Sequence, residues 1–122
     1  MYLVGAPHAN KAAAQRLLEL CVTKQEELVT DVEVFQEILH RYLALQRPEC
    51  IDPAWMVLTR LAVKVYPLEE ADVRNAREIV RGASRLSARD AVHVAVMKRH
   101  GVSRILSFDR DLDELPGIQR LS

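Results

Sequence analysis

Apolar residues recur at helical spacing along much of the chain, and short runs of β-branched residues separate these stretches. The spacing predicts a first helix over 10–22, and the β-compatible run 28–30 follows it. A second helix is predicted to begin at a capping box formed by Thr30 and Glu33 and to end near Leu45. Its buried stripe is predicted to consist of Phe35, Ile38, Leu39 and Tyr42.

The middle of the chain continues this alternation of helices and strands. Apolar spacing predicts a third helix around Trp55 and Leu58, and the run 62–67 has strand chemistry and ends at a proline. A fourth helix is predicted over 69–82, where it stops near a glycine. Its apolar periodicity is expected to turn three residues toward the core, namely Val73, Ala76 and Val80.

The last third of the chain holds the most apolar helix and the clearest strand. A helix that begins with Ser87 and Asp90 and ends at Gly101 is apolar on nearly every side, so we predict that it is buried. Strands are predicted over 104–108 and 118–121. Because short strands alternate with helices and no hairpin signal is present, the sequence predicts an α/β fold with a parallel sheet covered on both faces.

Composition narrows the class of protein. The 122 residues are 49% hydrophobic, which suits one domain over 1–122 with its own core. Basic and acidic residues number 17 each, so the zero net charge argues against a polycationic nucleic-acid coat protein. The sequence shows neither a signal peptide nor a membrane span of roughly 18 apolar residues. We therefore expect a soluble protein that contacts no membrane. Cys21 and Cys50 lack the spacing of a zinc site or a redox motif, so we expect both to be reduced, in the cytoplasm.

Three acidic residues lie where open parallel sheets place functional sites, beyond the carboxyl ends of the strands. Asp109 follows the clearest strand, Glu37 lies in the helix after the run 28–30, and Asp90 lies in the first turn of the buried helix. Carboxylates from separate elements, without a histidine or cysteine pair at zinc spacing, favour an oxygen-rich site for Mg²⁺ or Mn²⁺. Such an ion activates water and neutralises the charge of a phosphodiester.

Each of these residues also has a structural interpretation. Asp90 is the expected third residue of a capping box, Glu37 lies on a polar helix face, and Asp109 can cap the turn after its strand. His93, inside the apolar helix, is predicted to be a packed histidine rather than a general base. A row of arginines can either track an RNA backbone or form a solvated, ion-paired helix face. The row consists of Arg74, Arg77, Arg81 and Arg85.

Three segments in this order resemble the PIN domain of the ribonuclease toxins in VapBC toxin–antitoxin operons. They read LVTDVEVFQEIL over 28–39, SARDAVH over 87–93 and ILSFDRDLD over 105–113, and the resemblance covers nearly the whole chain. It implies a PIN-like three-layer α/β/α fold with a short parallel sheet. The implied catalytic and metal-binding residues are Glu37, Asp90 and Asp109, with Ser107 and Asp113 in support.

The resemblance also implies an activity and partners. Members of this family are Mg²⁺- or Mn²⁺-dependent endoribonucleases that cleave single-stranded or looped RNA, often tRNA or rRNA. A protein of this kind is held inactive by a VapB-type antitoxin and forms a homodimer. The alternative function is a degenerate or truncated, non-catalytic PIN-like domain that binds an antitoxin or dimerises.

The chain departs from the family pattern at its N-terminus. The family's first strand is central in the sheet and ends in an aspartate, whereas this sequence has no acid before Glu19. In the preferred register the segment 1–8 follows that strand, which is then absent from the chain. In the other register 2–4 is the strand, and Gly5 takes the place of the aspartate. We therefore expect an internal or mis-assigned start, weak metal binding, poor cleavage and exposed strand edges that favour self-association.

Overall fold

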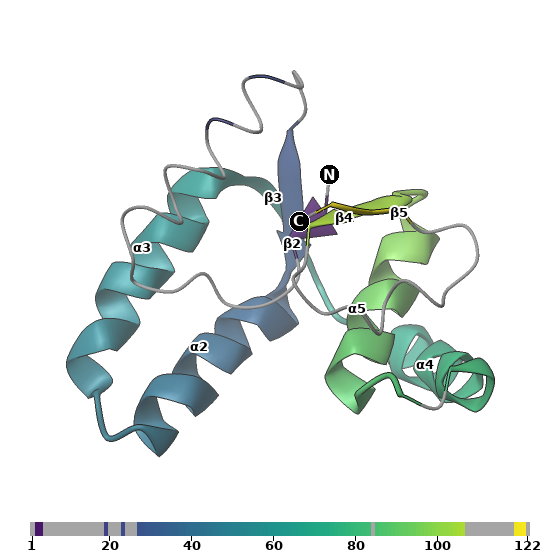
Figure 1. Cartoon of the computed structure of the whole chain (residues 1–122), viewed down its shortest axis with the longest axis horizontal. Helices are drawn as coiled ribbons and strands as arrows, with labels where there is room; N and C mark the ends of the chain where they lie inside the picture. The colour runs from purple at the N-terminus through teal and green to yellow at the C-terminus, as the bar shows by residue number, and fades with distance from the viewer. Residues whose placement is uncertain are drawn as a thin grey trace.

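A parallel sheet forms the middle layer of the structure. The computed structural model describes residues Tyr2–Leu3, 19, 23, 27–83, 85–106 and 119–121. Within them the sheet has five strands in the order β3-β2-β1-β4-β5, and every pair of neighbours is parallel (Figure 1). The strands are β1 (Tyr2–Leu3), β2 (Leu28–Asp31), β3 (Ala62–Tyr66), β4 (Arg104–Leu106) and β5 (Gln119–Leu121). The predicted parallel sheet is confirmed.

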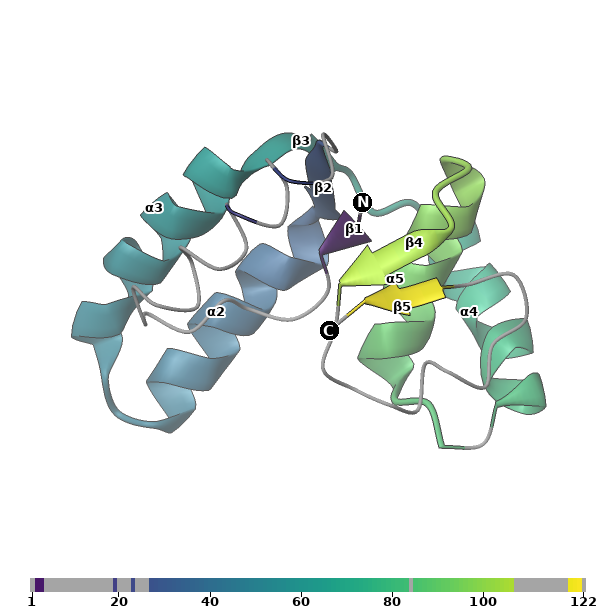
Figure 2. The same ribbon diagram turned by 45° about the horizontal axis from the view of Figure 1, so that its top comes forward.

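Helices cover both faces of this sheet. On one side lie α2 (Val32–Ala44) and α3 (Ile51–Leu61), joined by the short 3-10 helix η1 (Pro48–Cys50). On the other side lie α4 (Glu70–Gly82) and α5 (Ala88–Arg99), as both views show (Figures 1 and 2). The predicted three-layer α/β architecture is confirmed.

Some predicted elements fall partly or wholly outside the described residues. The helix predicted over 10–22 does so except for Glu19, and the strand predicted over 104–108 is described only up to Leu106. In the described part of the chain, no helix has the length and apolar character needed to cross a membrane.

The central position of the sheet is occupied by residues near the N-terminus. Tyr2 pairs with both β2 and β4, and Leu3 pairs with β4 as well. The Thr30 hydroxyl adds a hydrogen bond of 2.9 Å to the backbone carbonyl of Leu3. The expectation that this position has no strand, and that edges are exposed there, is therefore wrong. Tyr2–Leu3 lies in the sheet as the other register requires, whereas Gly5 lies outside the described residues.

Alternation along β1 divides the core into two clusters. Successive side chains of a strand point to opposite faces, so Tyr2 packs under α4 and α5 while Leu3 packs under α2 and α3. The cluster on the Tyr2 side includes Tyr66, Ala76, Leu86, Val94, Met97 and Ile105. The cluster on the Leu3 side includes Leu28, Val34, Ile38, Tyr42, Ala54 and Leu58. β1 thus holds both helical layers to one sheet, and α5 is buried along most of its length, as predicted.

The cap of α2 differs from the prediction by one residue. Asp31, not Thr30, is the N-cap, and its Oδ1 accepts hydrogen bonds from the backbone N–H groups of Glu33 at 2.9 Å and Val34 at 3.3 Å. The capping box predicted for Thr30 and Glu33 is therefore wrong, because Thr30 still belongs to β2. A carboxylate suits this position, since it satisfies unpaired N–H groups and the positive end of the helix dipole. Leu39 also departs from the predicted stripe, being 39% exposed.

α4 buries a charge where the periodicity predicts an apolar residue. Val73 is 52% exposed, whereas its neighbour Asp72 is fully buried. Arg99 of α5 binds the Asp72 carboxylate with two hydrogen bonds, from Nε to Oδ1 at 2.8 Å and from Nη2 to Oδ2 at 2.9 Å. An ion pair therefore joins α4 to α5, beside the apolar contact of Ala76, which is buried as predicted.

The turn after α5 depends on a glycine. Gly101 has a φ of 70°, in the left-handed region that disfavours residues with a side chain. We expect Gly101→Ala to lower the free energy of unfolding by about 1 kcal/mol, although an added Cβ would have nothing within 4 Å. Gly82→Ala is the matched control, because Gly82 ends α4 with equal space and no left-handed φ. It should raise stability by about 0.5–1 kcal/mol in urea unfolding, and equal effects of the two changes would contradict the backbone argument.

Candidate functional site

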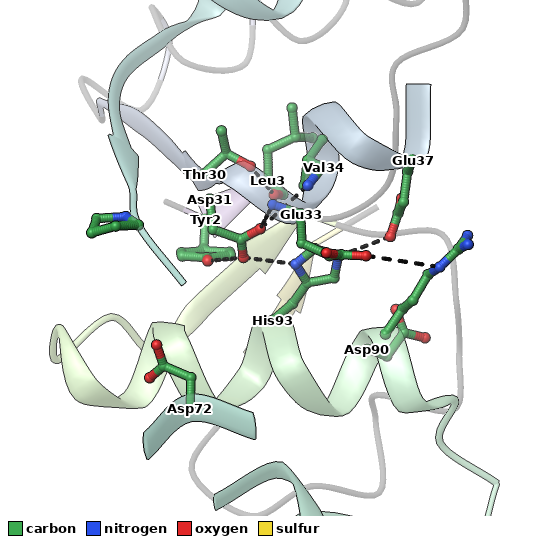
Figure 3. A network of polar contacts seen from close by, with 12 residues as sticks. Tyr2, Leu3, Thr30, Asp31, Glu33, Val34, Glu37, Asp72, Asp90 and His93 are labelled. Carbon is green, nitrogen blue, oxygen red and sulfur yellow. Dashed lines mark hydrogen bonds and ion pairs between the residues drawn. The ribbon is translucent and has the colours of Figure 1, made fainter. Parts of the chain in front are cut away.

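Asp31 lies at the carboxyl end of β2, where the chain enters α2. Its carboxylate is fully buried and accepts hydrogen bonds on both oxygens. Oδ1 caps α2, while Oδ2 accepts from the Tyr2 hydroxyl and lies 2.7 Å from His93 Nδ1 (Figure 3). Burial, followed by the charge and hydrogen bond of Asp31, raises the pKa of the Tyr2 hydroxyl far above its usual range. Tyr2 therefore stays protonated and donates to Asp31.

His93 links Asp31 to Glu37 across the contact between α5 and α2. The ring is fully buried, with Nδ1 2.7 Å from Asp31 Oδ2 and Nε2 2.9 Å from Glu37 Oε1. Since carboxylates only accept, both ring nitrogens donate. Burial alone would lower the pKa of His93, but the hydrogen bonds and charges of Asp31 and Glu37 raise it to about 9. His93 is therefore buried, as predicted for a packed histidine, and its raised pKa favours the imidazolium form at neutral pH.

Glu37 and Asp90, two of the three predicted metal ligands, lie on the facing helices α2 and α5 (Figure 3). The Glu37 side chain is 14% exposed. Asp90 lies in the first turn of α5, where its backbone N–H donates to the Ser87 hydroxyl at 3.1 Å, so the predicted cap of this helix is confirmed. Asp90 and His93 share a face of α5, one turn apart. The contact of His93 with Glu37 therefore brings both predicted ligands to the same part of the helix interface.

The other predicted site residues lie outside this contact. Asp109, Ser107 and Asp113 are outside the described residues. The four arginines of the predicted row, Arg74, Arg77, Arg81 and Arg85, are all exposed. Glu78 Oε1 lies 2.7 Å from Arg81 Nη1 and 4.0 Å from Arg77 Nε. Two of the arginines thus take part in ion pairs, as the structural interpretation predicts, and RNA binding by the row stays a prediction.

A further carboxyl group lies beside this network. Glu33 Oε1 is 3.9 Å from Arg89 Nε, and the Glu33 side chain is mostly buried. Burial raises the pKa of Glu33 above its ordinary value, and this effect outweighs the positive charge of His93, which lowers it. The first turns of α2 thus present Asp31, Glu33 and Glu37 around one imidazolium, and acidic groups outnumber basic ones there.

The carboxylate oxygens of Glu37 and Asp90 are the type of ligand that a hard cation such as Mg²⁺ or Mn²⁺ prefers. A cation of this type takes several oxygen ligands, so two carboxylates are part of a site. Among the residues that the structure describes, no group of three or more histidine, cysteine, aspartate or glutamate side chains is arranged to hold a metal ion. The third predicted ligand, Asp109, belongs to the segment outside that description.

Sequence reasoning missed Asp31 and the contacts of His93. The signal for Asp31 was its position between a β-compatible run and a helix, which is where a parallel sheet turns its chain toward a site. The capping interpretation of Thr30 hid that signal. For His93 the sequence offered only an apolar helix with one histidine. Its two partners come from another helix and another strand end, so no local spacing predicts them.

Comparisons with known proteins place the chain in a family. Residues 1–118 match the family model of the PIN domain. Ribonuclease VapC13 of Mycobacterium tuberculosis and VapC ribonuclease Mb1869c of Mycobacterium bovis are each 51% identical over 122 residues, which is 100% of this chain and 93% of each relative. Ribonuclease VapC23 of Mycobacterium tuberculosis is 38% identical over 112 residues, or 92% of this chain and 88% of the relative.

A solved structure agrees with this match at the level of the fold. The crystal structure of VapBC2 from Rickettsia felis bound to a DNA fragment from its promoter superposes with a TM-score of 0.72. The alignment covers 98% of this chain and 96% of that chain at 9% sequence identity, so it shows the fold alone. The chain belongs to the PIN-domain family, among its VapC members.

Proposed function

We propose that the chain is the ribonuclease toxin of a VapBC toxin–antitoxin system, a Mg²⁺- or Mn²⁺-dependent endoribonuclease that cleaves single-stranded or looped RNA such as tRNA or rRNA. The observation that carries the proposal is the position of Glu37 and Asp90 on the facing helices α2 and α5, where Glu37 contacts His93, one turn from Asp90. Relatives that are named VapC ribonucleases and are 51% identical along the whole chain support the same activity.

In this proposal Glu37, Asp90 and Asp109 hold the cation, and Ser107 and Asp113 support them. The ion, when bound, supplies water activation and neutralises charge on the phosphodiester. The chain's own residues fix the geometry, because Glu37 is tied to His93 and the first turn of α5 is capped by Ser87.

The proposed partners follow from the same family. RNA is the substrate, and the exposed arginine row on α4 and the turn after it is proposed to contact its phosphates. A VapB-type antitoxin is the proposed protein partner, and the structural relative, which is a VapBC complex, supports it. We further propose that the protein acts in the cytoplasm and forms a homodimer.

RNA cleavage with Mn²⁺ tests the activity. We expect the chain to cut a mixed tRNA and rRNA substrate slowly, in line with the poor cleavage expected from its sequence. Each of Glu37→Gln, Asp90→Asn and Asp109→Asn should lower this rate by about tenfold or more, because each removes the charge of one proposed ligand. Glu49→Gln is the matched control, because this exposed carboxylate on η1 pairs only with the neighbouring Arg47 in the described part of the chain.

The alternative is a non-catalytic PIN-like domain that binds an antitoxin or forms dimers. It is favoured by the sequence, which has no acid before Glu19 to fill the family's first-strand position. A chain without Mn²⁺-dependent cleavage in any form, whose oligomeric state in solution is nevertheless a stable dimer, would support this alternative over the nuclease.

A further inference from the structure

Glu37 does not stand alone on the surface of α2. Its Oε1 lies 2.9 Å from His93 Nε2, and the ring that donates to it is completely buried. The hydrogen bond uses one of the two carboxylate oxygens, and a carboxylate can bind a further ligand through the second. The position of this side chain is thus set from α5 as well as from its own helix.

His93 in turn is held from its far side. Nδ1 lies 2.7 Å from Asp31 Oδ2, and the Asp31 carboxylate is fixed by the Tyr2 hydroxyl and by the backbone N–H groups of Glu33 and Val34. Each of these donors belongs to the sheet or to the first turn of α2. A continuous series of hydrogen bonds therefore runs from the central strand through Asp31 and His93 to Glu37 (Figure 3).

The geometry of this series explains why histidine suits the position. The carboxylates of Asp31 and Glu37, at the start of α2, flank the His93 ring of α5, and both side chains are mostly or fully buried. An imidazole ring presents one nitrogen to an oxygen of each carboxylate, at 2.7 Å from Asp31 and 2.9 Å from Glu37. Other residues of similar size cannot do both, because an amide reaches only one partner and an aromatic ring reaches neither.

We propose that His93 is a positioning residue that holds the Glu37 carboxylate in place for the cation through its Nε2–H, with Asp31 fixing the ring from the other side. The inference rests on the proposed function, since it assigns Glu37 a cation to bind. Partners of this type, one step removed from the metal, orient the ligating side chain, and their loss typically weakens metal binding or activity about 10–100-fold.

Two substitutions separate the two halves of this contact. His93→Gln places an amide N–H near the position of Nε2, where it can still donate to Glu37. His93→Asn places its amide near Nδ1, where it can donate to Asp31 but not to Glu37. Both remove the positive charge and the ring, so they share the structural cost. They differ in whether Glu37 keeps its donor, which makes them a matched pair.

Mn²⁺ binding by calorimetry and the kcat and KM of RNA cleavage are the functional readouts. We expect His93→Asn to weaken Mn²⁺ binding about tenfold or more and to lower kcat with little change in KM for RNA. His93→Gln should restore Mn²⁺ affinity to within about threefold of the parent chain. Equal Mn²⁺ affinities in the two variants, at equal folded fractions in urea unfolding, would overturn the proposal, because a purely structural role predicts that result.

Crystal structures of both variants without metal keep the inference separate from the proposed function. The Glu37 carboxylate should keep its place in His93→Gln and leave it in His93→Asn. If Glu37 moves as expected but the parent chain neither binds Mn²⁺ nor cuts RNA, the nuclease proposal and the cation at Glu37 fail, whereas the contact by which His93 positions Glu37 stands. A Glu37 side chain unmoved in His93→Asn would overturn the positioning role whatever the activity.

A measurement on the parent chain covers the case in which both variants fail to fold. Nitrogen NMR of the parent chain should show a hydrogen-bonded proton on His93 Nε2. Glu37→Ala removes a side chain at the rim of the interface, and it should change the Nε2–H signal while leaving Nδ1–H in place. An Nε2 signal that ignores Glu37→Ala would contradict the hydrogen bond on which the inference depends.

Discussion

Asp31→Ala should lower the free energy of unfolding by about 3–5 kcal/mol, the usual cost of leaving a buried charge without its partner. The change removes the cap of α2 and leaves two buried donors, the Tyr2 hydroxyl and His93 Nδ1, without their acceptor. The central strand, α2 and α5 meet at this carboxylate, so its loss weakens contacts in both helical layers. Urea unfolding followed by circular dichroism measures the effect.

Asp31→Asn separates the cap from the charge. Asparagine is as good an N-cap as aspartate, so its oxygen can still accept from Glu33 and Val34, whereas an amide nitrogen at the place of Oδ2 faces the two buried donors. We expect this variant to lose most of the stability lost in Asp31→Ala, with the cap accounting for a further difference of about 1 kcal/mol. A cost below roughly 0.5 kcal/mol, typical of surface substitutions, would show that Asp31 makes no important buried contacts.

Features that depend on neighbouring residues could be predicted from the sequence. Apolar spacing located α2, α4 and α5, and the alternation of helices with short β-branched runs predicted a parallel sheet between two helical layers. The error at β1 has a different origin. Tyr2–Leu3 is too short for a pattern of its own, and its place is set by pairing with two strands that are distant in the chain. Such pairing has no local signal.

The residues of the candidate site likewise include some that the sequence predicts and others that it does not. Glu37 and Asp90 could be singled out because each follows a strand or begins a buried helix. They lie on facing helices, and their role as metal ligands stays a prediction. Apolar periodicity assigned Val73 to the core, but the buried residue is Asp72, since Arg99 on the next helix neutralises it. A buried charge is predictable only together with its partner. The partners of Asp72, like those of His93, are known only once the helices are packed.

Arg99→Met should lower the free energy of unfolding by about 2–4 kcal/mol, because it leaves the Asp72 carboxylate buried without its cation. The estimate lies below that for Asp31→Ala, since the Arg99 side chain is 27% exposed and water can reach part of the gap. Arg99 also donates a hydrogen bond to the Pro67 carbonyl at 3.2 Å, so the Arg99→Met variant loses this hydrogen bond to the loop before α4 as well. Arg81→Met is the matched control, because its pair with Glu78 is exposed and should contribute less than about 1 kcal/mol.

Acidification gives the same prediction an internal test. The hydrogen bonds from Arg99, acting against burial, hold the pKa of Asp72 below its ordinary value of 3.8. A carboxyl group whose pKa is lowered by folding stabilises the folded state fully when the pH is above its pKa in the unfolded chain. This contribution is lost as the pH falls through its pKa in the folded chain. In Arg99→Met burial acts on Asp72 without the opposing effect of Arg99, so the pKa of Asp72 is higher and this carboxyl group becomes protonated first in the variant. The stability difference between the parent chain and Arg99→Met should therefore be full at neutral pH and shrink on acidification, as Asp72 becomes protonated in the variant before it does in the parent chain. A difference that stays constant down to the acid transition would mean that Arg99 stabilises α4 and α5 by packing alone, without the charge of Asp72.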